Sequence, residues 1–426
     1  MVTKTAPEAE IVNLVDAYAR RICSAVLEQY AGDSVCSPLG IWLLLAACAT
    51  AASESERPSL EEALGCSTSQ AAALLAGFLE APPAALRTAM ALWVRSADRT
   101  TSLVEWSASL PPAVERGPVP TQATADAWTE RHTQGLIVRF PIELDELSRL
   151  VLASVLATKV SWETPFALEP AADHLRLSSP WLGQVEQVLL DHGGGELTML
   201  ADTEAAGVVA VHFTQAVEEL GVLCVAADPT VDRQQVFEAA HELARRCRSD
   251  TFGHARHSLF DLPLGEGGAW SITEREVRTH KPDARLEEIE HVVLPAWRSE
   301  STLDLKASAL FGALPSLDAL LKLIGPSEEG DETVAVQSAV ASFSPEGFEA
   351  AAVSAFGVRT LGVSRPPNRG LERRARLLFD HPFAAIALAG SSSDFRRARA
   401  GHTDLFCLPL FSAWVETPAK TNSSSS

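Results

Sequence analysis

The side chains that could do chemistry are scattered, and their spacings match no catalytic or metal-binding motif. His241-Glu242 begins like the helix motif of zinc proteases, but a second histidine does not follow at the required spacing. His254 and His257, with Cys247 upstream, are zinc-ligand types without a fourth ligand at a suitable distance along the chain, so a loop is the better interpretation. The sequence therefore predicts no metal site here.

Two glycine-rich segments, 193–195 and 265–268, lack the lysine and the strand-to-helix context that a phosphate-binding loop requires. The sequence also contains no Gly-x-Ser-x-Gly motif, which would place a nucleophilic serine on a sharp turn. We therefore expect neither a cofactor nor an enzymatic activity.

The stretch 346–361 stands out for a different reason. It reads Glu-Gly-Phe-Glu-Ala-Ala-Ala-Val-Ser-Ala-Phe-Gly-Val-Arg-Thr-Leu, and such an alanine-rich run alone favours a helix. It follows a β-leaning run, 334–343, and the turn residues Ser344-Pro345-Glu346-Gly347, and a basic stretch rich in proline and glycine comes after it. This context predicts a strand, a hinge and an exposed loop over about 346–376, and a loop of that length in a compact domain is typically functional.

The same stretch has the composition of a segment that can become a strand. Gly347 permits unusual backbone angles, and small alanines can enter a sheet without displacing packed neighbours. Because side chains alternate along a strand, one face would carry Phe348, Ala350, Ala352 and Ser354, and the other Glu349 and Ala351.

The rest of the chain predicts helices first and strands later, which indicates an α+β fold with a large central sheet. Ser37 before Pro38 is a helix start, and Ser59 with Glu62 resembles a capping box that ends at Gly65. Helices are expected at 9–29, 39–52, 121–131 and 231–246. Strands are expected at 150–162, 196–200, 207–212, 221–227, 290–295, 334–343, 384–389 and 405–415.

The composition limits the classes of partner that this chain could bind and the compartment in which it would function. Hydrophobic residues make up 46% of the chain, enough for a sizeable core, and the formal charge of -20 disfavours nucleic acids and anionic membranes. The seven cysteines are odd in number, scattered and without a Cys-x-x-Cys pair, which predicts buried free thiols. Residues 1–10 lack the apolar core of a secretory signal, so we expect a cytoplasmic protein, with export by an unrecognised route as the alternative.

Seven parts of the chain resemble the serpin family of serine protease inhibitors. The stretch 346–361 is similar to the hinge and reactive-centre loop. Six motifs follow the family's order: Ser37-Pro38, Thr133-Gln134-Gly135-Leu136-Ile137, Trp162-Glu163-Thr164-Pro165-Phe166, Leu294-Pro295, Glu300-Ser301 with Asp304-Leu305, and Phe379-Asp380-His381-Pro382-Phe383. The resemblance implies one domain over residues 1–418, with helices around a large mixed β-sheet plus smaller sheets. The serine-rich composition of 419–426 predicts a disordered tail.

The resemblance also implies a mechanism, in which a serine protease attacks the loop and the cleaved loop inserts into the sheet before the acyl-enzyme is hydrolysed. Counting fourteen positions beyond Gly347 places the scissile bond between Leu361 and Gly362. A leucine there suits chymotrypsin-, elastase- or subtilisin-like proteases. Arg359 and Arg365 are alternatives that suit trypsin-like proteases.

Further roles follow from the resemblance. The hinge would comprise Glu346, Gly347, Phe348, Glu349, Ala350, Ala351 and Ala352, and the region where the sheet opens would include Ser37, Pro38, Ser154, Trp162 and Gln337. Trp162 would cap the opening, although an ordinary buried tryptophan is the alternative. Gly40, Ser154 and Gln337 stand where the family usually has other polar residues, so their hydrogen bonds would differ.

One departure argues against inhibition. Phe348 replaces the small residue that inhibitory members carry after the hinge glycine, and overpacking a dense sheet costs about 1–3 kcal/mol. Phe356 raises a smaller concern on the same face. The alternatives to an inhibitor are a non-inhibitory binding or chaperone-type serpin and an unrecognised hydrolase. We expect a monomer, and the basic cluster Arg369, Arg373, Arg374 and Arg376 is either a docking site for an acidic partner or a solvated loop.

Overall fold

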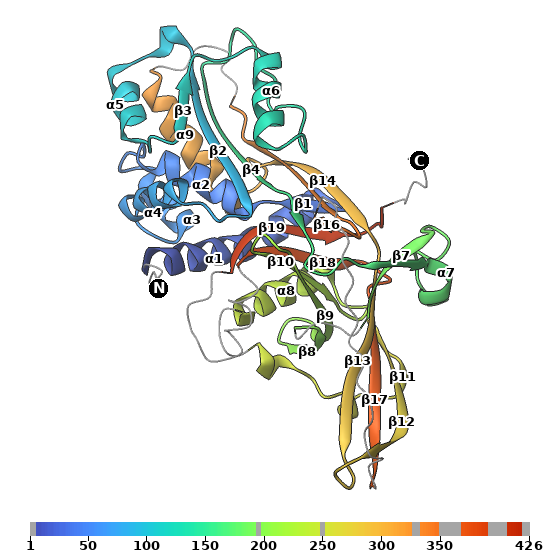
Figure 1. The fold of residues 1–426 in the computed structure, drawn as a ribbon. Helices are drawn as coiled ribbons and strands as arrows, with labels where there is room; N and C mark the ends of the chain where they lie inside the picture. Colours follow the sequence, from blue (N-terminus) through green and yellow to red (C-terminus); the bar gives the residue numbers. More distant parts are fainter. Residues whose placement is uncertain are drawn as a thin grey trace.

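The computed structural model describes residues 6–192, 197–247, 252–325, 333–348, 368–390 and 407–419. Most of the helices gather at one end of the molecule, and a narrow β-sheet arm extends from the other end (Figure 1). The helices are α1 (Ala6–Gln29), α2 (Pro38–Ala49), α3 (Arg57–Leu64), α4 (Thr68–Glu80), α5 (Thr101–Ser109), α6 (Gln122–His132), α7 (Ala171–His174), α8 (Arg233–Cys247) and α9 (Ala313–Leu323).

The start of α2 is set by its sequence. Ser37 is the N-cap residue, its hydroxyl accepts a hydrogen bond from the Gly40 amide at 3.2 Å, and Pro38 opens the first turn. The helix is buried along almost its whole length, as expected from its apolar sequence. The predictions of α1 and of this helix start are confirmed.

The predicted capping box at Ser59 and Glu62 is wrong. Helix α3 begins at Arg57 with Glu56 as its N-cap, three residues before the predicted cap at Ser59, because Pro58 is preorganised for the first turn of a helix. Gly65 does end the helix, in the left-handed conformation with φ of 73°.

The predicted central sheet is present as two ladders with a gap between them. One ladder has the order β3 (Val114–Gly117), β2 (Leu86–Val94) and β4 (Leu150–Thr158). The other pairs β14 (Trp297–Asp304) with β15 (Val336–Phe343) in an antiparallel register. Strands β4 and β15 border the same cavities, but no hydrogen-bonded ladder joins these two described strands.

Strand β4 has two different faces. Its Val151, Ala153 and Val155 side chains pack with Trp93 of β2 and Trp128 of α6, whose rings meet edge to face at 5.2 Å. The alternate side chains Leu150, Leu152 and Leu156 face the main core and are only partly buried. The incomplete burial on this face follows from the missing neighbour strand.

A second, six-stranded sheet forms the centre of the molecule. Its order is β1 (Ser34–Cys36), β19 (Leu408–Val415), β18 (Phe383–Ala389), β10 (Leu220–Ala226), β9 (Gly207–Gln215) and β8 (Met199–Thr203). Strands β10, β18 and β19 are buried throughout, and α8 packs its apolar side on β10 and β18.

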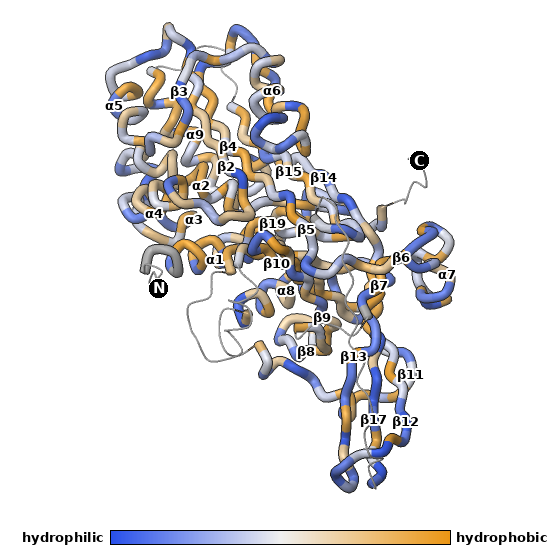
Figure 2. The backbone as a smooth tube through the Cα atoms, in the orientation of Figure 1, coloured by the Kyte–Doolittle hydropathy of each residue, from blue (hydrophilic) through white to orange (hydrophobic). Residues whose placement is uncertain are grey.

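The arm belongs to a third sheet, with the order β11 (Gly265–Glu266), β12 (Trp270–Thr279), β17 (Asn368–Leu378), β13 (Arg285–Leu294), β7 (Gln187–His192) and β6 (Ala167–Pro170). Strands β12, β17 and β13 extend away from the body and are mostly hydrophilic toward their far end (Figure 2). The expected loop boundary at residue 376 is therefore wrong, because residues 368–376 lie in β17.

The prediction of buried free thiols is confirmed for six of the seven cysteines. All seven cysteines are free thiols, six of them buried, and burial raises the pKa of Cys36 and of Cys48 to about 12. Among the described residues, no helix is long and apolar enough to cross a membrane.

Candidate functional site

The candidate site begins at the turn that follows β15. The Ser344 amide donates to the Gly347 carbonyl at 3.0 Å, which closes the turn predicted from Ser344-Pro345-Glu346-Gly347. After the turn, β16 (Gly347–Phe348) pairs antiparallel with β5 (Val160–Ser161), which continues β4. The first two residues after the turn are thus already a strand beside the Thr158 end of β4, which we call the upper end; the Leu150 end is the lower end.

Position 347 needs a glycine because the backbones of β16 and β5 lie very close together. A Cβ atom at position 347 would lie 2.2 Å from the Val160 carbonyl oxygen and 3.0 Å from the Ser161 Cα. Only a residue without a side chain fits there unless one of the strands moves.

Trp162 holds the turn in place. Its indole Nε1 donates to the Ser344 carbonyl at 3.0 Å, and its amide donates to the Glu346 carbonyl at 3.0 Å. The ring is buried against Phe343, with ring centroids 4.7 Å apart, and against Phe166 at 6.3 Å. Trp162 therefore lies at the upper end of the gap, where the segment leaves β15, and it is also a buried core residue.

The gap between β4 and β15, which we call the slot, contains cavities along its length. A narrow cavity of about 20 Å³ lies at the upper end between 156–158 and 339–342. One of about 70 Å³ follows between 152–156 and 336–339, and one of about 390 Å³ lies at the lower end beside 150–152 and 333–336. The slot therefore has unfilled volume along the whole of β4.

The middle of the slot is tied by a polar network. Ser37 and Gln337 bond reciprocally, since the Ser37 amide donates to Gln337 Oε1 and Gln337 Nε2 donates to the Ser37 carbonyl, both at 2.9 Å. The Ser37 hydroxyl donates to the Leu410 carbonyl at 2.7 Å. The Ser154 hydroxyl donates to the Gly40 carbonyl at 3.2 Å. Helix α2 is thus bonded to both strands that border the slot, although those strands do not bond to each other.

The glycine at position 40 fits this network. A Cβ atom there would lie 3.1 Å from Gln337 Nε2 and 3.3 Å from Leu156 Cδ1. The long Gln337 side chain therefore occupies space that a side chain at position 40 would need.

After residues 349–367, which lie outside the described residues, the chain continues in β17, which lies between β12 and β13. Strand β17 pairs antiparallel with β12 over ten residue pairs and parallel with β13 over eight. Ion pairs cross both ladders: Arg373 with Glu274 at 2.8 Å, Arg374 with Glu288 at 2.8 Å, and Arg275 with Glu372. Of the predicted basic cluster, Arg373, Arg374 and Arg376 are used within this sheet and its neighbours, which favours a structural role for them.

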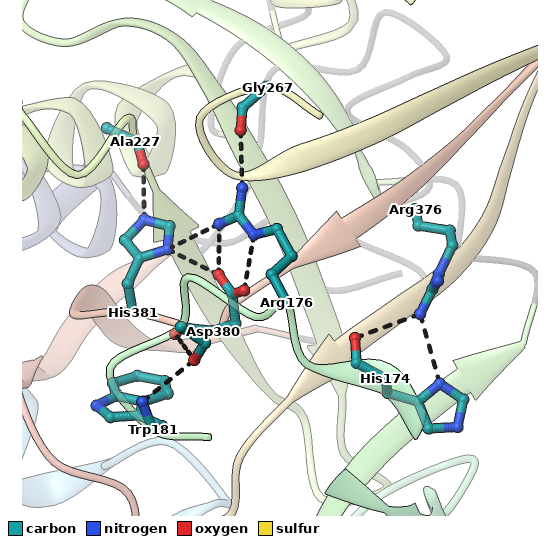
Figure 3. Close-up of polar contacts among 9 residues, drawn as sticks. His174, Arg176, Trp181, Ala227, Gly267, Arg376, Asp380 and His381 are labelled. Atoms are coloured by element: carbon teal, nitrogen blue, oxygen red, sulfur yellow. Dashed lines mark hydrogen bonds and ion pairs between the residues drawn. The ribbon is translucent and has the colours of Figure 1, made fainter. Parts of the chain in front are cut away.

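A buried polar cluster lies at the end of β17 (Figure 3). Arg176 donates to both oxygens of Asp380, at 2.7 and 2.5 Å, and to the Gly267 carbonyl at 2.8 Å. His381 contacts Asp380 through Nδ1 at 3.0 Å and the Ala227 carbonyl through Nε2 at 2.8 Å. Burial raises the pKa of Asp380, but the hydrogen bonds from Arg176 and His381 outweigh it and lower the pKa to about 2. This cluster joins four chain segments and is a structural tie.

His212 is a second buried polar residue, and it lies next to Phe166. His212 on β9 contacts the hydroxyls of Thr198 and Thr214, both at 3.0 Å, and burial lowers its pKa to about 3. Its ring meets Phe166 edge to face at 5.8 Å. The residue is therefore a neutral core histidine at physiological pH.

The candidate metal ligands do not come together. Cys247 is buried at the end of α8, and His257 contacts Asp202 at 2.9 Å. Among the residues that the structure describes, no group of three or more potential ligands could hold a metal ion.

Several predicted residues lie outside the described residues. They are Glu349, Ala350, Ala351, Ala352, Arg359, Leu361, Gly362 and Arg365. Of the predicted sheet-opening residues, Ser37, Pro38, Ser154 and Gln337 lie together at the middle of the slot, and Trp162 lies at its upper end. The sequence did not reveal the partners Val160 and Leu410, which contribute only backbone atoms here and so leave no side-chain signal.

Comparison with known proteins gives three findings. Residues 14–174 match the family model of the serpins, the serine protease inhibitors. No curated protein matches the sequence. Solved structures similar to this chain include the thermophilic serpin Tengpin in its native state, with 16% identity and a TM-score of 0.64 over 98% of this chain and 96% of that one.

Two further solved structures extend the comparison. Human thyroxine-binding globulin is 14% identical, with a TM-score of 0.62 over 97% of this chain and 100% of its own. Serpin48 of the insect Tenebrio molitor is 16% identical, with a TM-score of 0.58 over 98% and 100%. At these identities the likeness shows the fold, and it confirms the predicted α+β class.

Proposed function

We propose that this chain, which matches the serpin family model over residues 14–174 and shares the fold of solved serpins, inhibits serine endopeptidases as a suicide substrate. Serpins are in general protease inhibitors rather than enzymes. In the proposed mechanism a protease cleaves the segment between β16 and β17, and the freed end enters the slot as a new strand while the acyl-enzyme persists.

The observation that carries this proposal is the position of β16 at the open end of the slot. Gly347 is paired with Ser161 and Phe348 with Val160, and we take this pairing as the start of the register for insertion. In an antiparallel ladder each step forward on one strand is a step back on the other. Continued along β4, this register would bring Ala352 opposite Leu156 and Val358 opposite Leu150, the first residue of the strand.

The slot also has room for the side chains that this register would bring. Residues directly opposite each other point to the same face of a sheet, so Ala352, Ser354 and Phe356 would join the face of Leu152 and Leu156. Small side chains would meet the narrower cavities near the middle of the slot. Phe356, opposite Leu152, would meet the cavity of about 390 Å³, which removes the concern that it overpacks the sheet.

The register is consistent with Leu361 as the residue before the scissile bond. Insertion through Val358 would leave residues 359–361 to connect the new strand to the trapped protease. With Arg359 as the bait, the protease would have to approach the bottom of β4 more closely. We therefore propose cleavage between Leu361 and Gly362 by a chymotrypsin-, elastase- or subtilisin-like protease, with Arg365 and a trypsin-like protease as the alternative.

A binding or chaperone-type function is the second candidate, and Phe348 favours it. Inhibitory serpins carry a small residue at that position, and a bulky one slows the first step of insertion, which lets the protease escape. Thyroxine-binding globulin, which is named for its ligand, shares the fold of this chain. For this candidate the segment would be cleaved without trapping the protease.

The test is incubation of the purified protein with chymotrypsin, elastase, subtilisin and trypsin, followed by denaturing gels and mass spectrometry. The proposal predicts an adduct that survives heat and detergent, and a fragment that ends at Leu361. Cleavage in 349–367 without an adduct for any of the four proteases would favour the second candidate.

A further inference from the structure

The cavity of about 390 Å³ at the lower end of the slot has the properties of a small-molecule site. It lies between α2, α9 and the lower ends of β4 and β15, and its volume falls in the range typical of ligand pockets. Most of its lining residues are apolar, and leucines from three elements are prominent among them. Representative residues are Leu44 and Leu45 of α2, Leu150 and Leu152 of β4, and Leu317 and Leu321 of α9.

Several of these side chains are only partly buried because they face the cavity. Leu317 and Leu321 are one helical turn apart on α9, so they present adjacent apolar surfaces. At the open side, Leu147 lines the cavity and is 77% exposed. An apolar cavity with an exposed leucine at its mouth is suited to an apolar ligand, since such cavities hold water poorly.

The charges at the mouth select among apolar ligands. Glu143 and Asp145 line the cavity and are exposed. Arg149, which also lines it, is held by Asp98 at 2.9 Å and donates to the Ile324 carbonyl at 3.1 Å. Lys306 donates to the carbonyl of Thr333, another lining residue, and the exposed carboxylates of Glu143 and Asp145 outnumber this cation. These carboxylates repel an anionic head group and attract a cationic one.

We propose that this cavity binds a small apolar molecule that is uncharged or carries a single positive charge. The apolar body fills the space between α2 and α9, and a basic head group lies beside Glu143 and Asp145. A fatty-acid carboxylate is disfavoured by the same two side chains.

Binding here has a consequence that rests on the proposed function. The cavity borders the lower half of β4, where residues 354–358 would insert. A bound molecule would block that half of the insertion but leave β16 and the cleavage site untouched. The ligand therefore turns the inhibitor into a substrate, so the share of cleaved but untrapped protein rises.

The binding experiment uses the whole protein and the uncharged dye N-phenylnaphthylamine, which fluoresces in apolar surroundings. Decanol, decylamine and decanoate then compete, because they share a ten-carbon chain and differ in charge. We expect decanol and decylamine to displace the dye at concentrations at least about fivefold below that of decanoate, since mouth carboxylates act on the head group. Equal or preferred displacement by decanoate would overturn the assignment of the charge.

Variants locate the site. Leu317→Trp and Leu321→Trp each fill the cavity and are expected to weaken dye binding at least about tenfold. Leu314→Trp is the matched control, because Leu314 lies on the same helix, is exposed and does not line the cavity. Circular dichroism checks that the variants fold. Unchanged dye binding by both folded cavity variants would overturn the proposal.

The two proposals fail in different ways. Dye binding is measured without a protease, so it tests the cavity even for a chain that traps no protease. If adducts form and saturating decanol does not increase the cleaved, untrapped fraction, the blocking effect is contradicted while the inhibitor function stands.

Discussion

The backbone of Gly347 lies so close to Val160 that a Cβ atom on Gly347 would come within 2.2 Å of the Val160 carbonyl oxygen. This contact fixes where the segment after β15 meets the extension of β4. In the proposed mechanism, insertion would start at Gly347.

Gly347→Ala is therefore expected to separate β16 from β5. Hydrogen exchange of the Trp162 amide, which donates to the Glu346 carbonyl beside this pairing, should become faster because its acceptor moves away. With a protease that forms adducts with the natural protein, the ratio of cleaved to trapped chains should rise. Glu346→Gln is the control, because Glu346 is exposed, and glutamine can still accept the hydrogen bond that the Ser344 hydroxyl donates to this side chain at 3.2 Å. Equal exchange rates in the two variants would contradict this account of the contact.

Gln337→Leu tests the network at the middle of the slot. It removes two hydrogen bonds of the Ser37 backbone; the Ser37 carbonyl keeps the Ile41 amide at 3.2 Å, but the Ser37 amide loses the Gln337 acceptor. Leaving such a polar group unpaired costs about 1–3 kcal/mol. We expect a clearly lower midpoint of thermal unfolding. Ser338→Ala, next to it on β15, removes only a contact with the exposed Thr302 and should change the midpoint little. A similar midpoint for both variants would show that the network contributes no stability.

Breaking the buried ion pair of Arg176 and Asp380 is expected to cause a larger loss of stability. Removing Arg176 leaves the Asp380 carboxylate buried without its guanidinium partner, although His381 still contacts it, and this costs about 3–5 kcal/mol. Arg176→Met should therefore lower the thermal midpoint strongly. Arg369→Met, which breaks the exposed pair with Glu276, should cost less than about 1 kcal/mol. Comparable losses for the two variants would argue against the importance of burial.

His212 predicts a dependence on pH. Its pKa is about 3 in the folded chain and about 6.5 when unfolded, so the unfolded chain binds the extra proton between these values. The stabilising contribution is complete above pH 6.5 and falls as the pH drops toward 3, by up to about 1.4 kcal/mol per pH unit. Asp191, at 4.0 Å, is the charged group that faces the ring.

The comparison with His212→Gln isolates this contribution from that of the carboxylates, which titrate in both proteins. We expect the natural chain to lose stability more steeply than the variant between pH 6 and pH 4. Parallel curves in that range would mean that His212 is not buried in its neutral form.

Much of the body of the fold could be predicted from the sequence. Strands β9, β10, β18 and β19 are buried, and their apolar runs indicated them within a few residues. Helix α6 begins after the N-cap Thr121, as expected, and α8 matches the predicted helix to within two residues at its start. In these elements, local preference and burial agree.

The arm could not be predicted in the same way. Strand β12 reads Trp-Ser-Ile-Thr-Glu-Arg-Glu-Val-Arg-Thr, and β17 carries five basic or acidic residues, so both have the composition of a loop. Apolar side chains are buried at the end of each strand that meets the body, at Trp270 and Ile272 of β12 and at 375–378 of β17, while ion pairs cross the ladders farther out. Such pairs join residues about 90 to 100 positions apart, and a sequence pattern does not reveal them.

Only part of the candidate site could be predicted from the sequence. Ser37, Gln337 and Trp162 carry distinctive side chains, and the resemblance pointed to them. The open slot was not foreseen, because it depends on a ladder that β4 and β15 do not form.

The central claim is that the cleaved chain completes the sheet between β4 and β15. The most direct measurement is thermal unfolding of the protein before and after a single cut in 349–367, made with dilute subtilisin and located by mass spectrometry. The account predicts that the cut chain unfolds at a much higher temperature, because the inserted strand pairs its backbone and fills the slot. A cut chain that unfolds at the same or a lower temperature would contradict it.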